Sequence, residues 1–127
     1  MPLIRIDLQK GKTADYRKKV GQVIYDAMIA TVAMPKNDRF QLIMEHDPDN
    51  FIYDSDYLGV HRTNDLIMIT ITFNDNRTTD QKKALYKTIA DSLHEAVGLR
   101  REDALVVLVE VKKENWSFGN GVAQYAA

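Results

Sequence analysis

The 127-residue chain contains no cysteine, only three prolines and no long run of apolar residues. Without cysteine, the chain can have no disulfide scaffold, thiolate metal site or cysteine nucleophile. No apolar stretch approaches the roughly 20 residues that a membrane-spanning helix needs. The charged residues Arg5, Asp7 and Lys10 interrupt the amino-terminal segment, so we expect no signal peptide and a cytoplasmic location.

The chain also lacks an excess of charge of either sign. Lysine and arginine together number 17, aspartate and glutamate number 18, and the formal net charge is -1. This balance gives no electrostatic reason to expect nucleic acid or a membrane surface as a partner. Hydrophobic residues make up 45% of the chain, which is enough to form the core of one domain.

What the chain does contain is one structural pattern that occurs twice. In its first half, residues 3–8 (LIRIDL) alternate apolar and polar side chains, which is typical of a half-buried strand. Thr13 can cap a helix whose apolar residues recur at helical spacing. Residues 40–45 (FQLIME) then predict a second strand.

The second half repeats this order of elements. Residues 66–73 (LIMITITF) are rich in β-branched residues and predict a strand. Residues 78–81 (TTDQ) have the sequence of a capping box, and Gly98 marks the expected end of the helix that follows. Residues 104–111 (ALVVLVEV) predict a strand that is buried on both faces.

An offset of 65 residues aligns the two halves, so we predict one α+β domain over residues 1–127. Its tandem β-α-β units span approximately 2–45 and 66–111, joined by a polar linker over 46–65. Because β-α-β crossovers are right-handed, both helices can cover the same face of a four-stranded mixed sheet. The glycines and aromatics of residues 112–127 predict a C-terminal hairpin or arm.

One face of such a sheet would be left without helices. The predicted strands at 66–73 and 104–111 are too apolar for a face that is exposed to water. We therefore expect other subunits to cover this face.

Pro2 is the first residue that could carry chemistry. If Met1 is removed, Pro2 becomes a secondary amine at the start of an interior strand. A neutral amine there can abstract a proton next to a carbonyl, and a cationic one can donate to a carbonyl oxygen. The simpler interpretation is that a small second residue permits processing of Met1 and has no catalytic role.

Arg77 and Asp38 each allow a functional and a structural interpretation. Arg77 precedes the cap of the second predicted helix, where a bound anion would complement both the guanidinium and the helix dipole. It could equally be a solvated arginine in a loop. Asp38 lies just before the second predicted strand and is either a turn residue or a group that orients water or holds a proton.

Trp116 and Phe118, in the stretch WSFG, are either core or interface aromatics or the wall of a cleft. Arg62 could pair with the acidic linker or reach a neighbouring subunit. No metal-ligand spacing occurs among the three histidines, which are His46, His61 and His94.

Taken in order, Pro2, the doubled β-α-β unit, Asp38, Arg77 and WSFG resemble the tautomerase superfamily, and within it the malonate semialdehyde decarboxylase-like branch. The stretches that carry this resemblance are PLIRIDL, PKNDRFQ, LGVHRT, NRTTDQKKALY and ENWSFGNGVAQY, which span nearly the whole chain. The resemblance implies a homotrimer in which the bare sheet faces form a central barrel. It also implies that no cofactor or metal is needed.

The resemblance further implies roles for the candidate residues. Pro2 would be the catalytic amine, Asp38 its partner, Arg77 the clamp for a substrate carboxylate, and Trp116 and Phe118 the pocket wall. The implied activity is decarboxylation of a small oxo acid. The alternatives are a keto–enol tautomerase of the phenylpyruvate type, a hydratase acting on a small carbonyl or unsaturated acid, and a non-catalytic trimer that binds a metabolite or protein.

This chain departs from the decarboxylase pattern at one point. Some decarboxylases of the branch carry Arg-x-Arg before the second helix, where this chain has Asp75-Asn76-Arg77. The reversed charge at the first position would lower affinity for a small anion or indicate a different substrate. It therefore bears on decarboxylation more than on amino-terminal proline chemistry.

Overall fold

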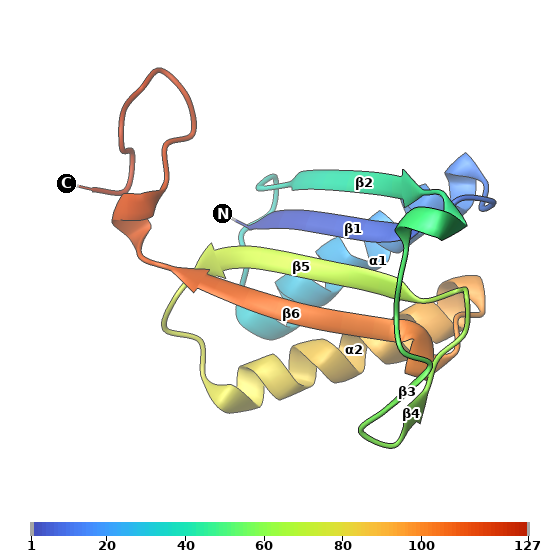
Figure 1. Cartoon of the computed structure of the whole chain (residues 1–127). Coiled ribbons are helices and arrows are strands. Elements are labelled where there is room, and N and C mark those ends of the chain that lie inside the picture. The colour runs from blue at the N-terminus through green and yellow to red at the C-terminus, as the bar shows by residue number, and fades with distance from the viewer. Residues whose placement is uncertain (1, 127) are drawn as a thin grey trace.

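The structure is a computed structural model that describes residues 2–126, so the predicted removal of Met1 lies outside the described residues. Four strands form one sheet, two long helices cover one of its faces, and the other face is bare (Figure 1). The α+β fold predicted from the repeat is confirmed.

The long elements and two short strands lie in chain order as β1 (Leu3–Gln9), α1 (Ala14–Val32), β2 (Phe40–His46), β3 (Asp56–Tyr57), β4 (Val60–His61), β5 (Ile67–Asn74), α2 (Thr79–Val97) and β6 (Ala104–Val111). The sheet order is β2-β1-β5-β6. Strand β1 is parallel to β2 and β5 is parallel to β6, while β1 and β5 pair antiparallel at the centre. The first strands of the two units therefore pair with each other, and this β1–β5 pair joins the units into one sheet.

The offset of 65 residues holds in three dimensions. Helices α1 and α2 each have 19 residues and begin and end at positions related by this offset. Ion pairs between helix and strand recur in the same way, as Arg17–Glu45 in the first unit and Lys82–Glu110 in the second. Single turns of 3-10 helix after β2 and β6 also correspond, so the repeat continues past its predicted ends.

The predicted helix caps are present. Thr13 accepts a hydrogen bond from the backbone N–H of Tyr16, and Thr78 forms a reciprocal capping box with Gln81. Gly98 ends α2 in the left-handed region with φ 71. These caps satisfy backbone groups that a helix leaves unpaired at its ends, so they set where α1 and α2 begin.

The core lies between the helices and the covered face of the sheet. Alternate side chains of the two central strands point into it, because successive residues of a strand face opposite sides. Its fully buried members include Ile4, Ile6, Ile24, Ile69, Ile71, Leu85, Ile89 and Leu93.

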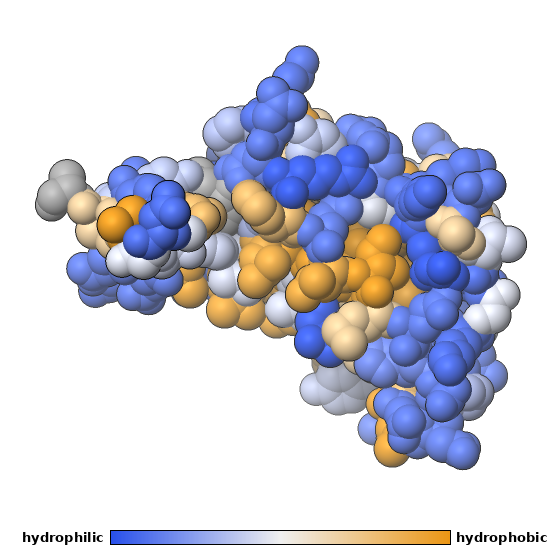
Figure 2. All heavy atoms as spheres, turned by 90° about the horizontal axis from the view of Figure 1, so that it is seen from above, coloured by the Kyte–Doolittle hydropathy of each residue, from blue (hydrophilic) through white to orange (hydrophobic). Residues whose placement is uncertain are grey.

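The bare face carries an apolar patch, which is visible in Figure 2 as orange spheres among blue ones. We call it the open-face patch; its members, each at least 39% exposed, are Leu3, Phe40, Leu42, Met44, Val107 and Val109. Strand β5 contributes less to it than its sequence suggested, because its isoleucines are buried against the helices. The apolar character of this face therefore comes mainly from β2 and β6.

The segments outside the repeat are short. The linker between the units contains the two-residue strands β3 and β4, which pair with each other. Residues 112–126 form a 3-10 turn and then an irregular arm that extends beyond the end of the sheet (Figure 1). Among residues 2–126, neither helix is both long and apolar enough to cross a membrane.

Candidate active site

Pro2 lies directly before β1, which is an interior strand with β2 on one side and β5 on the other. Pro2 is buried, in keeping with this position. It opens onto a cavity of about 250 Å³ whose lining residues are Pro2, Leu3, Phe40, Trp116, Ser117 and Phe118. We call this the proline cavity.

Aromatic side chains from the C-terminal arm form one wall of the proline cavity. The rings of Trp116 and Phe118 stack with centroids 5.2 Å apart. Phe118 also contacts Phe40 at 6.4 Å and Tyr125 at 5.3 Å, the latter edge to face. The structure therefore brings Pro2, Trp116 and Phe118 to one cavity, although 114 residues separate Pro2 from Trp116 in the chain.

Arg77 follows β5 by three residues, and its guanidinium turns back toward the end of the sheet. Its Nη1 donates to the carbonyl oxygen of Asn74 at 3.1 Å and its Nε to that of Val32 at 3.4 Å. The guanidinium carbon lies 5.3 Å from the centre of the Phe73 ring. Val32 is the last residue of α1, where the helix dipole favours a cation. Sequence reasoning considered only the unfavourable start of α2.

Arg77 lines a cavity of about 360 Å³, which we call the arginine cavity. Its polar lining also includes Asn74, Asp75, Gln81 and Lys113. Trp116 Nε1 donates to Asn74 Oδ1 at 2.7 Å, so this bond joins a wall residue of each cavity. Pro2 and Arg77 thus line neighbouring cavities rather than a single one.

Asp38 is half-buried in the connection between α1 and β2 and does not line either cavity. It lies two residues before Phe40, which pairs beside Leu3 in the parallel register of β1 and β2. The chain thus brings Asp38 to the same end of the sheet as Pro2. Its role as a partner of Pro2 stays a prediction.

Sequence reasoning missed three residues of this region. Asn74 is 2% exposed and ends an otherwise apolar strand, which was a signal that its amide has a specific partner. Phe40 is apolar but 53% exposed at the start of β2. Lys113 lies in the 3-10 turn before WSFG and lines the arginine cavity. It adds a second cation to Arg77 in a cavity that also contains the carboxylate of Asp75.

The described residues 2–126 include no group of three or more histidine, aspartate or glutamate side chains that could hold a metal ion. The charged side chains that line the two cavities are those of Arg77, Asp75 and Lys113. Such a set can hold and orient an organic anion.

Comparisons with known proteins agree with this arrangement. Residues 38–119 match one family model described as tautomerase enzyme, and residues 2–61 match a second model with the same description. The probable tautomerase YusQ of Bacillus subtilis is 42% identical over 124 residues, which is 98% of each chain. The probable tautomerase YrdN of the same organism is 32% identical over 98% of this chain and 96% of its own.

Solved structures give the same result. Malonate semialdehyde decarboxylase, studied as wild type, as an amino-terminal proline-to-alanine mutant and in inactivated form, superposes with a TM-score of 0.90. It is 30% identical over 97% of this chain and 95% of its own. The FG41 malonate semialdehyde decarboxylase inhibited by 3-bromopropiolate is 32% identical, with a TM-score of 0.89 over 97% and 93% of the two chains. Native fused 4-OT, 14% identical with a TM-score of 0.79, shares the fold over 98% of both chains.

One family match covers well over half of the chain, and the two Bacillus relatives align with it almost from end to end. The chain therefore belongs to the tautomerase superfamily of enzymes.

Proposed function

We propose that this protein is a cofactor-independent enzyme in which the amine of Pro2, freed by removal of Met1, acts on a small oxo acid in the manner of malonate semialdehyde decarboxylase. One observation carries the proposal. Pro2 is buried at the head of an interior strand and lines a cavity of which the aromatic arm forms one wall. A proline that served only to permit Met1 processing would need no such cavity.

Decarboxylation of a 3-oxo acid by these residues requires the substrate to reach from the proline cavity to the neighbouring arginine cavity. The recorded hydrogen bonds of Arg77 use Nε and Nη1, which leaves Nη2 to bind the substrate carboxylate. Cationic Pro2 donates a hydrogen bond to the carbonyl oxygen. The bond to the carboxylate carbon breaks, its electron pair moves into the carbon–carbon double bond of an enol whose oxygen takes the proton of Pro2, and carbon dioxide leaves. The enol carbon then takes up a proton from water while the enol O–H returns its proton to Pro2, so the carbonyl re-forms.

A keto–enol tautomerase or a hydratase is the second candidate, and Asp75 is the observation that favours it. This carboxylate lines the arginine cavity, where its negative charge weakens the attraction of the cavity for a substrate carboxylate. In a tautomerase, neutral Pro2 would take a proton from the carbon next to the carbonyl, and the electron pair would move to the carbonyl oxygen. The curated relatives are themselves described as probable tautomerases.

The test is a parallel screen of oxo acids, enols and unsaturated acids with the wild type, Pro2→Ala and Arg77→Ala. We expect Pro2→Ala to lower kcat by about 100-fold or more, because it removes a proton-transfer group. Arg77→Ala should mainly raise KM, by about tenfold or more, because it removes a charge-assisted contact. Intact-mass measurement must first establish that Met1 is absent from each preparation.

Arg39→Ala is a matched control for Arg77→Ala, since Arg39 is an exposed arginine that lines neither cavity. Negligible effects of both Pro2→Ala and Arg77→Ala on every accepted substrate would contradict the site assignment. Function without turnover that survives Pro2→Ala would point instead to a non-catalytic binding module.

The protonation state of Pro2 separates the tautomerase from the decarboxylase and the hydratase. A pKa of the Pro2 nitrogen near or below neutrality would favour the tautomerase, because the amine must be neutral to accept a proton. A clearly basic pKa would favour the decarboxylase or hydratase. Nitrogen-15 NMR of the labelled amine over a pH range measures this directly.

We also propose that the protein is a homotrimer whose subunits bury the open-face patch against one another. Six exposed apolar side chains lie on one sheet face, and exposed apolar patches of this kind mark interaction surfaces. Related tautomerase-fold structures include one described as a symmetric trimer of fused 4-OT.

A further inference from the structure

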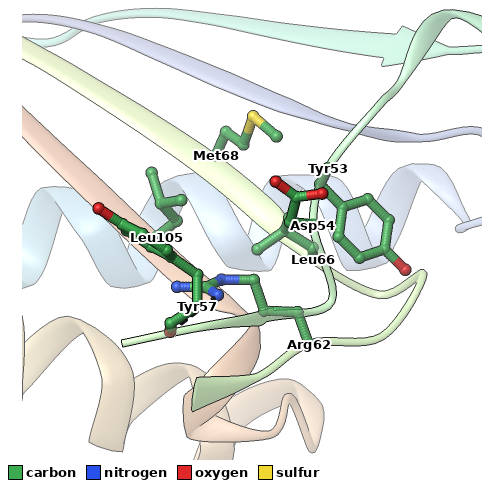
Figure 3. Close-up of a pocket in the computed structure, with 7 residues that line it drawn as sticks. All are labelled: Tyr53, Asp54, Tyr57, Arg62, Leu66, Met68 and Leu105. Carbon is green, nitrogen blue, oxygen red and sulfur yellow. Dashed lines mark hydrogen bonds between the residues drawn. The ribbon is translucent and has the colours of Figure 1, made fainter. Parts of the chain in front are cut away.

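A third cavity, of about 280 Å³, lies near the opposite end of the sheet from Pro2. Figure 3 shows its lining residues, which are Tyr53, Asp54, Tyr57, Arg62, Leu66, Met68 and Leu105. They come from the linker between the two units and from the first residues of β5 and β6. Neither the family matches nor the proposed function assigns this cavity a role.

The cavity is the internal repeat's counterpart of the proline cavity. At the offset of 65 residues, Met68 corresponds to Leu3 and Leu105 to Phe40. Tyr53 corresponds in the same way to Phe118, and each follows a single 3-10 turn at the end of its unit. The second unit has therefore kept a cavity of similar size in the equivalent position.

The two cavities differ in the cation that they offer. The counterpart of Pro2 is Ile67, an interior residue of the chain that has no free amine. The charge comes instead from Arg62, which follows β4. In this third cavity, the guanidinium of Arg62 thus takes the place of the amine of Pro2.

Arg62 is poorly satisfied by the protein. Its Nε is buried and has no hydrogen-bond partner. Its Nη1 reaches the carbonyl oxygens of Tyr57 and Val60, both at 3.4 Å, which is long for a hydrogen bond. Because buried donors are normally paired, the unpartnered Nε and the two long Nη1 contacts leave Arg62 with hydrogen-bonding capacity for a ligand.

A carboxylate in the same cavity narrows the ligand class. Asp54 lines the cavity and has no ion pair or hydrogen bond with Arg62. The two side chains come from separate parts of the linker (Figure 3). Leu66, Met68 and Leu105 supply the apolar surface. A ligand that bears a carboxylate, a short apolar body and a hydrogen-bond donor would match all three features.

We propose that this cavity, the Arg62 cavity, binds a small organic acid that carries a hydroxyl or amino group. Its carboxylate pairs with Arg62, its donor group with Asp54, and its carbon skeleton packs against Leu66 and Met68. The proposal does not depend on the chemistry of Pro2.

The test is a titration with lactate, which has a carboxylate and a hydroxyl, and with propionate, which lacks the hydroxyl. Isothermal calorimetry should detect saturable binding of lactate to the wild type. We expect Arg62→Gln to weaken it about tenfold or more, because a charge-assisted pair is lost. Asp54→Asn should change the ratio of lactate to propionate affinity.

Two controls separate this cavity from the candidate active site. Arg101→Gln removes an exposed arginine whose side chain bonds to Asp91 of α2 and does not line the Arg62 cavity, so it should leave lactate binding unchanged. Arg77→Gln removes the proposed substrate clamp, and it should leave in place the lactate binding that Arg62→Gln weakens. If Arg77→Gln abolishes binding and Arg62→Gln does not, the anion binds in the arginine cavity and the proposal is wrong.

A second variant guards against unfolding of Arg62→Gln. Leu105→Trp fills the cavity and retains the guanidinium, so it should abolish lactate binding while thermal unfolding remains cooperative. Unchanged lactate binding in Leu105→Trp would overturn the proposal. A crystal structure in which a carboxylate of a neighbouring copy occupies the Arg62 guanidinium would overturn it as well.

Discussion

At the scale of single residues, Asn74 connects the two cavities of the candidate active site. Its side-chain oxygen accepts from Trp116 Nε1, and its backbone oxygen accepts from Arg77. Because Asn74 is buried and Trp116 is half-buried, loss of the Asn74 amide would leave the indole N–H without its protein partner. The orientation of the aromatic wall therefore depends on one amide at the end of β5.

We predict that Asn74→Ala destabilises the protein by about 1 to 3 kcal/mol and loosens the wall of the proline cavity. Trp116 is the only tryptophan, so its fluorescence reports this change directly. Acrylamide should quench the variant more strongly than the wild type. Asn74→Asp retains an oxygen acceptor and is the matched control; equal quenching of Asn74→Ala and wild type would contradict the prediction.

Two cationic neighbours on the surface control the pKa of the Asp91 carboxyl group. Hydrogen bonds from Arg101, and then from Lys87, lower the pKa of Asp91 from 3.8 to about 2. Because the pKa is lowered in the folded state, the stabilisation is present above the unfolded pKa and is lost as pH falls through the folded one. We predict that Arg101→Gln raises the pKa of Asp91 toward 3.8. Carbon-13 NMR of the carboxyl group measures it, and an unchanged midpoint would count against the pairing.

At the scale of elements, the two helices end in the same backbone conformation with different residues. Gly98 ends α2 with φ 71, and Ala33, its counterpart at the offset of 65, ends α1 with φ 55. A side chain is strained in this left-handed region, whereas glycine is not. The first unit therefore carries a cost that the second avoids.

We predict that Ala33→Gly stabilises the protein by about 0.5 to 1 kcal/mol and that Gly98→Ala destabilises it by a similar amount. Urea unfolding at a fixed protein concentration measures both. Ala30→Gly, at an exposed interior position of α1, is the control and should destabilise by about 1 kcal/mol. Destabilisation by Ala33→Gly would refute the argument.

At the scale of the whole molecule, the two faces of the sheet have different chemistry. The helices cover one face, while the open-face patch leaves Leu42 53% and Val107 47% exposed. Apolar surface of this kind is most stable when another subunit removes it from water.

We predict that Leu42→Asp converts the proposed trimer to monomers, because it places a charge in an interface that excludes water. Sedimentation velocity distinguishes the two states. Tyr86→Asp is the matched control, since Tyr86 is 39% exposed on α2, away from the patch. A wild type that sediments as a monomer, or a Leu42→Asp variant that remains trimeric, would exclude this interface.

The sequence by itself determined the order and limits of the repeated elements. Thr13, the capping box at Thr78 and Gly98 are local signals, since each acts on backbone groups within a few residues. The alternation in residues 3–8 likewise predicted which side chains of β1 enter the core. The sequence also identified Pro2, Trp116 and Phe118 as candidate site residues, and the structure brings them to one cavity.

Only the tertiary structure decided which distant groups meet. Arg77 bonds to Val32, 45 residues away, and Asn74 to Trp116, 42 residues away. No periodic pattern in the sequence predicts either contact, because each depends on how the ends of the sheet and helices pack. For the same reason, the separation of the proline and arginine cavities and the unpartnered Nε of Arg62 became apparent only in the folded chain.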